Sequence, residues 1–111
     1  MKGPAGGGYT TVEDLLAFAR AFRLDAPVSK AMLDRMWRAY PDKNSSDYGY
    51  GFATLETSVG RGVDHGGGFS GISADFLIYL DGGYTLAVLS KYGGGALPVS
   101  QKIQNLVGRV K

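Results

Sequence analysis

The 111-residue chain has no cysteine, only one histidine, and no long apolar run. Without cysteine there can be no disulfide, thiolate zinc site or catalytic thiol, so any nucleophile in the chain must be a hydroxyl. No run is long enough to cross a bilayer, and the opening "MKGPAGGGY" lacks the apolar core of a secretion signal, which leaves the localisation open. One histidine without a second ligand at helical or hairpin spacing predicts no metal site.

The chain also lacks a large excess of positive or negative charge. Twelve basic and ten acidic residues give a net charge of +2, and the basic residues are scattered along the chain, which argues against nucleic acid or a membrane surface as a partner. The hydrophobic share of 44% is that of an ordinary globular protein, so we expect residues 1–111 to form one domain.

Glycine is abundant instead, with 18 residues and Gly-Gly-Gly at positions 6–8, 66–68 and 93–95. Glycine raises the entropy that folding must overcome, so each cluster requires a structural or functional reason.

Hydrophobic periodicity divides the chain into a helical part (residues 1–47), antiparallel strands (48–95) and a C-terminal helix (96–111). The first helix follows a capping box formed by Thr10 with Glu13 or by Thr11 with Asp14. The second is expected to start after Ser29 and to end at Pro41. In the last helix we expect Pro98 at the first position. Its predicted core stripe is Val99, Ile103, Leu106, Val107 and Val110.

The strand region shows alternating rather than helical periodicity. "YGYGFATLE" and "RGVDHGG" are expected to form a hairpin, followed by "ISADFLIYL" and "YTLAVLSKY". The predicted fold class is therefore α+β, with an antiparallel meander of three to four strands whose helices cover one sheet face.

Two glycine motifs in "HGGGFSG" do not fit their usual context. Gly66, Gly68 and Gly71 satisfy G-x-G-x-x-G, but a strand follows where a nucleotide-binding fold needs a helix, so no cofactor is predicted. "HGGG" is similar to an oxyanion loop of α/β-hydrolases, yet their G-x-S-x-G elbow and parallel sheet are missing.

A Ser-His-Asp triad would combine His65 with Ser70 or Ser73 and with Asp64 or Asp75. Asp64 is a poor partner because neighbouring strand residues point to opposite faces. Asp75 is polar in an apolar strand, so we expect it to face solvent.

Three segments and the amphipathic helix after them carry a resemblance to a known family. The segments are "PAGGGYTTVEDLLAFARAF", "YGYGF" and "DHGGGFSGISADFLIYLDGGYTLAVLSK". In this order they resemble the C-terminal part of the serine β-lactamase and penicillin-binding-protein superfamily. The class C and esterase-like branch is the most similar, and the resemblance covers nearly the whole chain. It implies a partial β-lactamase/transpeptidase-like fold. His65, Gly66 and Gly67 match the triplet of the strand that walls the active site in that family.

The resemblance implies roles for these residues and a missing part. Gly66 and Gly67 would bind substrate, the Gly68 N–H would donate to an oxyanion, and His65 would support catalysis. The family acylates a serine in S-x-x-K with help from a tyrosine in Y-x-N, and neither pattern occurs here. The chain therefore resembles a fragment of a hydrolase that cleaves an ester, amide or β-lactam, and we expect it to be inactive alone. Histidine in place of lysine in the triplet favours ester or peptide substrates.

Two alternatives stay open. The glycine triplet could relieve crowding against a neighbouring region, or the chain could be a binding domain without catalysis that receives a peptide strand. In the family the last strand pairs with N-terminal strands that this sequence does not contain. We therefore expect an exposed edge from Tyr84 to Tyr92 to cause dimerisation or strand exchange, or a rearrangement that shields Leu86 and Val88.

Overall fold

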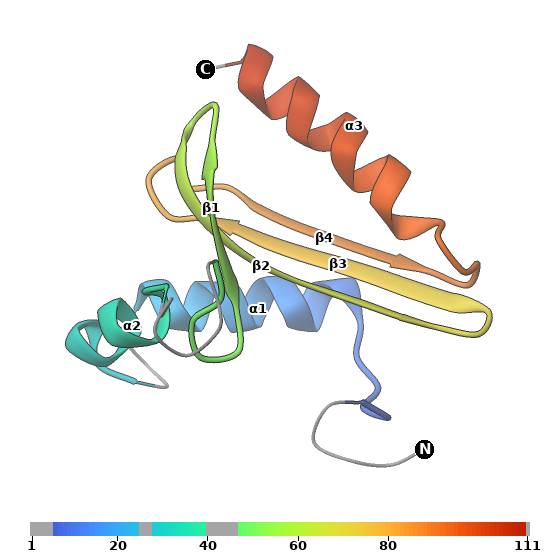
Figure 1. The fold of residues 1–111 in the computed structure, drawn as a ribbon, viewed down its shortest axis with the longest axis horizontal. Coiled ribbons are helices and arrows are strands. Elements are labelled where there is room, and N and C mark those ends of the chain that lie inside the picture. The colour runs from blue at the N-terminus through green and yellow to red at the C-terminus, as the bar shows by residue number, and fades with distance from the viewer. Residues whose placement is uncertain (1–5, 25–27, 40–46, 111) are drawn as a thin grey trace.

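The computed structural model describes residues 6–24, 28–39 and 47–110, which form an α+β arrangement (Figure 1). The elements in chain order are α1 (Val12–Arg23), α2 (Lys30–Met36), β1 (Ala53–Thr57), β2 (Gly60–Phe69), β3 (Ile72–Tyr79), β4 (Thr85–Ser90) and α3 (Ala96–Arg109). The strands form one antiparallel sheet in the order β1-β2-β3-β4, so the predicted meander is confirmed with four strands.

Helices cover both faces of this sheet, not one. Consecutive side chains of β3 alternate between two apolar clusters. The first joins β3 to α1 and α2, and the second joins β3 and β4 to α3. The buried members are Ala19, Phe22, Leu33, Phe52, Val63, Phe76 and Ile78 in the first, and Leu77, Tyr79 and Leu86 in the second. The expectation of one covered face was wrong because residues 76–79 form an unbroken apolar run, which is typical of a strand buried on both sides.

The starts of α1 and α2 lie where the capping residues predicted them. The Thr11 side chain accepts a hydrogen bond from the Asp14 N–H at 3.1 Å, and Ser29 does the same for Met32 at 3.2 Å. Helix α2 ends at Met36, and Pro41 lies outside the described residues.

Helix α3 is rotated relative to the predicted stripe. It begins at Ala96, so Pro98 is the third helical residue, still within the first turn where its missing N–H costs no helical bond. Ala96 and Ser100 are its buried residues, and Ile103 and Val107 pack on the second cluster. The remaining members of the predicted stripe, Val99, Leu106 and Val110, are exposed.

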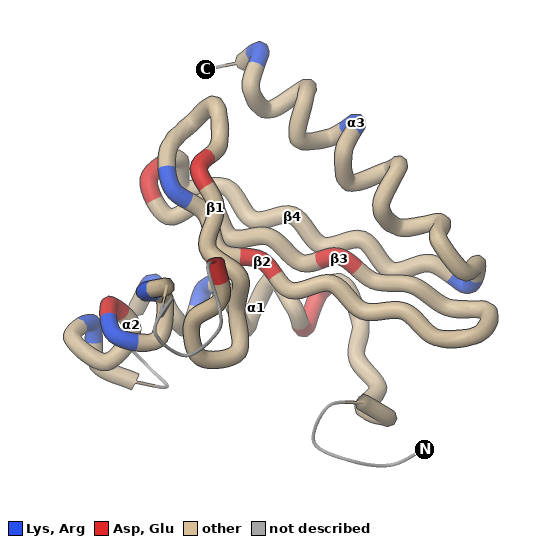
Figure 2. Tube along the Cα trace, viewed as in Figure 1, with Lys and Arg blue, Asp and Glu red and all other residues tan. Residues whose placement is uncertain are grey.

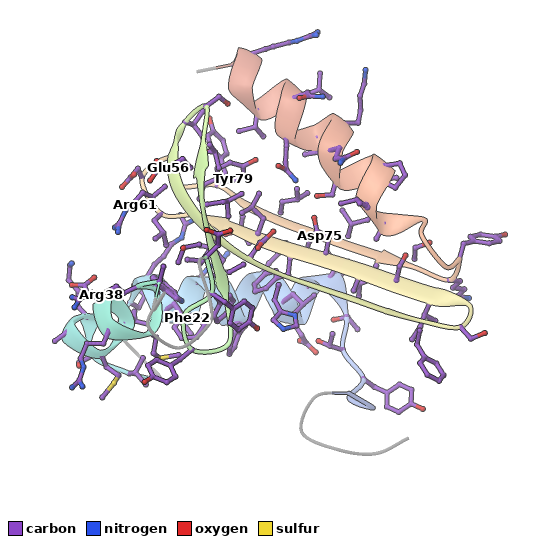
Figure 3. The ribbon with its side chains drawn as sticks, in the orientation of Figure 1. Phe22, Arg38, Glu56, Arg61, Asp75 and Tyr79 are labelled. Carbon is purple, nitrogen blue, oxygen red and sulfur yellow. The ribbon has the colours of Figure 1, made fainter. Side chains whose placement is uncertain are left out.

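A polar contact explains this rotation. Asp75 is not on the solvent side as expected: it is 7% exposed and lies between β3 and α3 (Figure 3). The fully buried Ser100 hydroxyl donates to Asp75 Oδ2, and Gln104 Nε2 donates to Ser100 Oγ at 3.0 Å. A buried carboxylate needs such donors, so α3 turns its polar residues inward at this point.

The segment "YGYGF" is a loop and not the start of a strand. The Gly49 N–H donates to the Phe52 carbonyl at 2.8 Å, and Gly51 has a φ of +82°. Tyr48 forms an isolated bridge with Ala53, where β1 begins. The alternation of aromatic and glycine residues is the pattern that predicts a strand, but the left-handed backbone at Gly51 turns the chain.

We expect the free energy of unfolding to depend on pH through Asp64. It lies on the α3 side of β2, and burial raises its pKa above the ordinary 3.8, as does the negative charge of Asp75, while His65 lowers it. Because the folded state holds this proton more tightly, the stabilising contribution is complete below pH 3.8 and is lost as the pH rises through the raised pKa. We expect Asp64→Asn to remove this dependence, measured as the difference between variant and wild type in urea-unfolding free energy across pH 3–8. A difference that does not change with pH would contradict the assignment.

Candidate functional site

Half of β2 has no strand on one side. Strand β1 has five residues and β2 has ten, and their pairing ends at Ala53 opposite Asp64. From residue 65 to residue 69, β2 pairs with β3 alone among the described residues. This half, called the open edge below, is exposed throughout and contains no charged residue (Figure 2).

Two glycines direct their backbone groups out of this edge. The Leu80 N–H donates to the Arg61 carbonyl at 2.8 Å, which identifies residues 61 and 80 as a hydrogen-bonded pair. In an antiparallel pair the bonded positions alternate, so residues 65, 67 and 69 bond to β3. Gly66 and Gly68 therefore present their N–H and C=O groups to the open edge, and Gly67 bonds inward.

Neither conformation nor packing within the described chain requires these three glycines. They are not among the glycines with positive φ, in contrast to Gly71 in the following turn, at +79°. A Cβ added at Gly67 would have nothing within 4 Å, and one at Gly66 would have its nearest neighbour, the Ala74 carbonyl oxygen, at 3.6 Å. The described residues thus provide no crowding for the triplet to relieve, and the space beside the triplet is available to another molecule or segment.

His65 stands at the start of the open edge with its side chain exposed. It lies opposite Phe76, on the α1 side of the sheet. Its ring centroid is 6.2 Å from that of Tyr48, with the rings inclined at 70°. The sequence does not single out Tyr48 as a site residue, because its glycine-spaced segment predicts a strand and not the loop that brings its ring to His65.

Neither of the two serines predicted from the sequence, Ser70 and Ser73, is brought to His65. Ser73 lies on the α3 side, where its hydroxyl donates to the Tyr92 carbonyl and accepts from the Ala96 N–H, both at 2.9 Å. Ser70 lies five residues along the strand from His65, about 16 Å at 3.3 Å per residue. Ser73 therefore fixes the start of α3, and Ser70 is too distant to give its proton to His65.

Neither aspartate serves His65 as the third member of a triad. Asp64 and Asp75 both face α3, on the opposite side of the sheet from His65. The prediction that Asp64 points away is confirmed. Among the described residues no group of three or more His, Asp or Glu side chains is arranged to hold a metal.

A recess in the described part of the molecule lies elsewhere. It has a volume of about 550 Å³ and is lined by residues that include Trp37, Arg38, Glu56 and Arg61 (Figure 3). It borders residues 39 and 47, between which the chain is not described, and it does not include His65 or the glycine triplet. We therefore place the candidate site at the open edge, where the exposed backbone groups are.

Comparison of the chain with protein-family models, curated proteins and solved structures gave no match. Within the described residues, none of the helices has the length and apolar character needed to cross a membrane.

The free space at the triplet gives a paired prediction. Gly67→Ala is expected to leave the unfolding free energy unchanged or to raise it by about 0.5–1 kcal/mol, because it restricts the unfolded chain and meets no neighbour. Gly49→Ala is the control: its Cβ would lie 2.1 Å from the Met36 carbonyl oxygen, so a loss of about 1–3 kcal/mol is expected. Denaturant unfolding measures both. A large loss in Gly67→Ala would mean that the triplet serves the fold.

Proposed function

We propose that the open edge of β2 is the substrate-binding strand of an acyl-transfer site of the serine β-lactamase and penicillin-binding-protein type. The observation that carries this proposal is an exposed strand whose outward N–H and C=O groups belong to glycines that neither conformation nor packing among the described residues requires. A substrate carbonyl or amide can approach such a backbone closely, because no side chain covers it.

Each residue of the site has a role in this proposal. The outward N–H of Gly68 donates to the oxyanion that forms when the acyl carbonyl is attacked. The outward groups of Gly66 bind the substrate amide, and Gly67 keeps the strand narrow. His65, beside Tyr48, donates a hydrogen bond to substrate or, when protonated, stabilises developing negative charge.

The nucleophile has to come from residues outside this site. No serine in the sequence has lysine three positions later, and neither Ser70 nor Ser73 is placed to be activated by His65. The 111 residues alone are therefore expected to provide half of a site, and a complete enzyme would add a serine in S-x-x-K to it. The proposed ligand is a small acyl compound, and no nucleic acid or cofactor takes part.

A second candidate function follows from the same edge. Because neither Ser70 nor Ser73 is placed to be activated by His65, the open edge can alternatively serve to accept an extended peptide as an additional antiparallel strand, held by main-chain hydrogen bonds. In this case the chain is a binding module. Its peptide would span residues 65–69, whereas an acyl compound would contact only the backbone of Gly66 and Gly68 and the side chain of His65.

NMR titration of the ¹⁵N-labelled chain tests the acyl site. On addition of an N-acyl dipeptide ester, the amide signals of Gly66 and Gly68 are expected to shift while that of Gly67, bonded to β3, stays in place as an internal control. Gly68→Pro removes the outward N–H at a position where an edge tolerates proline, and it should abolish the response. Shifts confined to regions away from β2 would overturn the proposal. Slowed hydrogen exchange of the Gly66 and Gly68 amides by an unreactive extended peptide would instead favour the binding module.

Turnover provides a further test. With a chromogenic β-lactam or an activated ester, we expect the chain to react no faster than a variant in which His65, Ser70 and Ser73 are all replaced by alanine. In a polypeptide that joins these residues to an S-x-x-K serine, His65→Ala should slow acylation at least about tenfold, because a positioned acid or base typically contributes about 10²–10⁴-fold. An acylation rate that His65→Ala does not change in that polypeptide would mean that His65 has only a structural role.

A further inference from the structure

The outer side of β4 is a second unpaired edge. Among the described residues β4 pairs only with β3, and it lies at the end of the strand order (Figure 1). Its sequence, "TLAVLS", contains no charged residue and no proline, which are the usual devices that prevent an edge from pairing. Leu86 is nevertheless buried, because its side chain packs on Ile103 and Val107 of α3. This edge therefore exposes its backbone together with the side chain of Leu89.

The hydrogen-bond pattern identifies which residues are available. The Tyr79 N–H donates to the Tyr84 carbonyl at 2.9 Å, so residues 79 and 84 form a bonded pair. Alternation along the register then directs residues 86, 88 and 90 toward β3. Thr85, Ala87 and Leu89 point their N–H and C=O groups outward.

We propose that a second copy of this chain pairs antiparallel with β4 about a two-fold axis at Ala87. This register sets Ala87 opposite Ala87 of the partner and Thr85 opposite Leu89 of the partner, with roughly six hydrogen bonds, two for each bonded pair. The strand is complementary to itself in this arrangement: the outward positions meet outward positions, the residue at the axis is small, and residues 85–90 include no charged side chain.

The side chains and flanking layers fit the same register. Leu86 comes opposite Val88 of the partner, and both side chains lie on the α3 side, so the second apolar cluster continues across the axis. Helices α1 and α3 contact β4 from opposite faces, and each copy therefore brings both covering layers to the joint sheet. The open edge of β2 lies on the other side of β3, so pairing of the 111-residue chain through β4 does not cover the proposed acyl-transfer site.

Disulfide formation tests the register, since the sequence has no native cysteine. Ala87→Cys places two thiols on residues whose Cα atoms are about 5.5 Å apart in a bonded pair, a separation that a disulfide spans. Mild oxidation is expected to give a covalent dimer in high yield. Thr85→Cys is the matched control. In the proposed register Thr85 and Thr85 of the partner are four positions apart along the strands, about 14 Å at 3.4 Å per residue, so this variant should cross-link poorly. Equal yields at the two positions, or no dimer with Ala87→Cys, would overturn the proposal.

Sedimentation of the chain without cysteine provides an independent measurement. The wild type is expected to dimerise, and Leu89→Lys, which adds a charge at an exposed edge position outside both clusters, should be monomeric with an unchanged circular dichroism spectrum. Leu97→Lys changes a leucine on α3 that is more exposed than Leu89 and should leave the dimer intact. A wild-type monomer would overturn the proposal, whether the edge is then solvated or filled by another segment of the same polypeptide.

Discussion

The fold depends on covering the central strand β3 on both faces. Its last four residues are apolar and point alternately to the two sides, so neither face can be left to water without exposing large side chains. This requirement sets α1 against one face and α3 against the other, and it makes β2 and β4 the neighbours of a buried strand. The positions of the open edge of β2 and of the unpaired edge of β4 follow from this requirement, because β4 ends the sheet and β1 covers only the first half of β2.

The polar residues of β3 are adapted to the same constraint. Ser73 and Asp75 lie on the α3 side of the strand and bond to the first turns of that helix, through Ala96 and Ser100 respectively. The apolar side chains of the second cluster then engage α3 further along its length. The helix is thus oriented by hydrogen bonds near its N-terminus and held by hydrophobic contacts near its C-terminus, which explains why its exposed face retains several apolar residues.

Local signals in the sequence predicted local structure well. Thr11 and Ser29 marked the helix starts because capping needs only a side-chain oxygen and nearby N–H groups. The meander followed from strand alternation and short turns. The buried Asp75 and the rotation of α3 were not predictable, since they depend on a serine 25 residues away along the chain. The open edge could not be foreseen either: it results from the length difference between β1 and β2, and "YGYGF" suggested a longer first strand than the one observed.

The glycine triplet limits how recognition at β2 can change. A strand without side chains binds a ligand through the N–H and C=O groups of its own backbone. These groups are the same whatever the ligand, so selectivity has to come from His65 at one end of the triplet and Phe69 at the other. Any substitution within the triplet adds atoms to a surface that has none to lose. Evolution or engineering at these three positions can therefore narrow the range of accepted ligands but has no means of widening it.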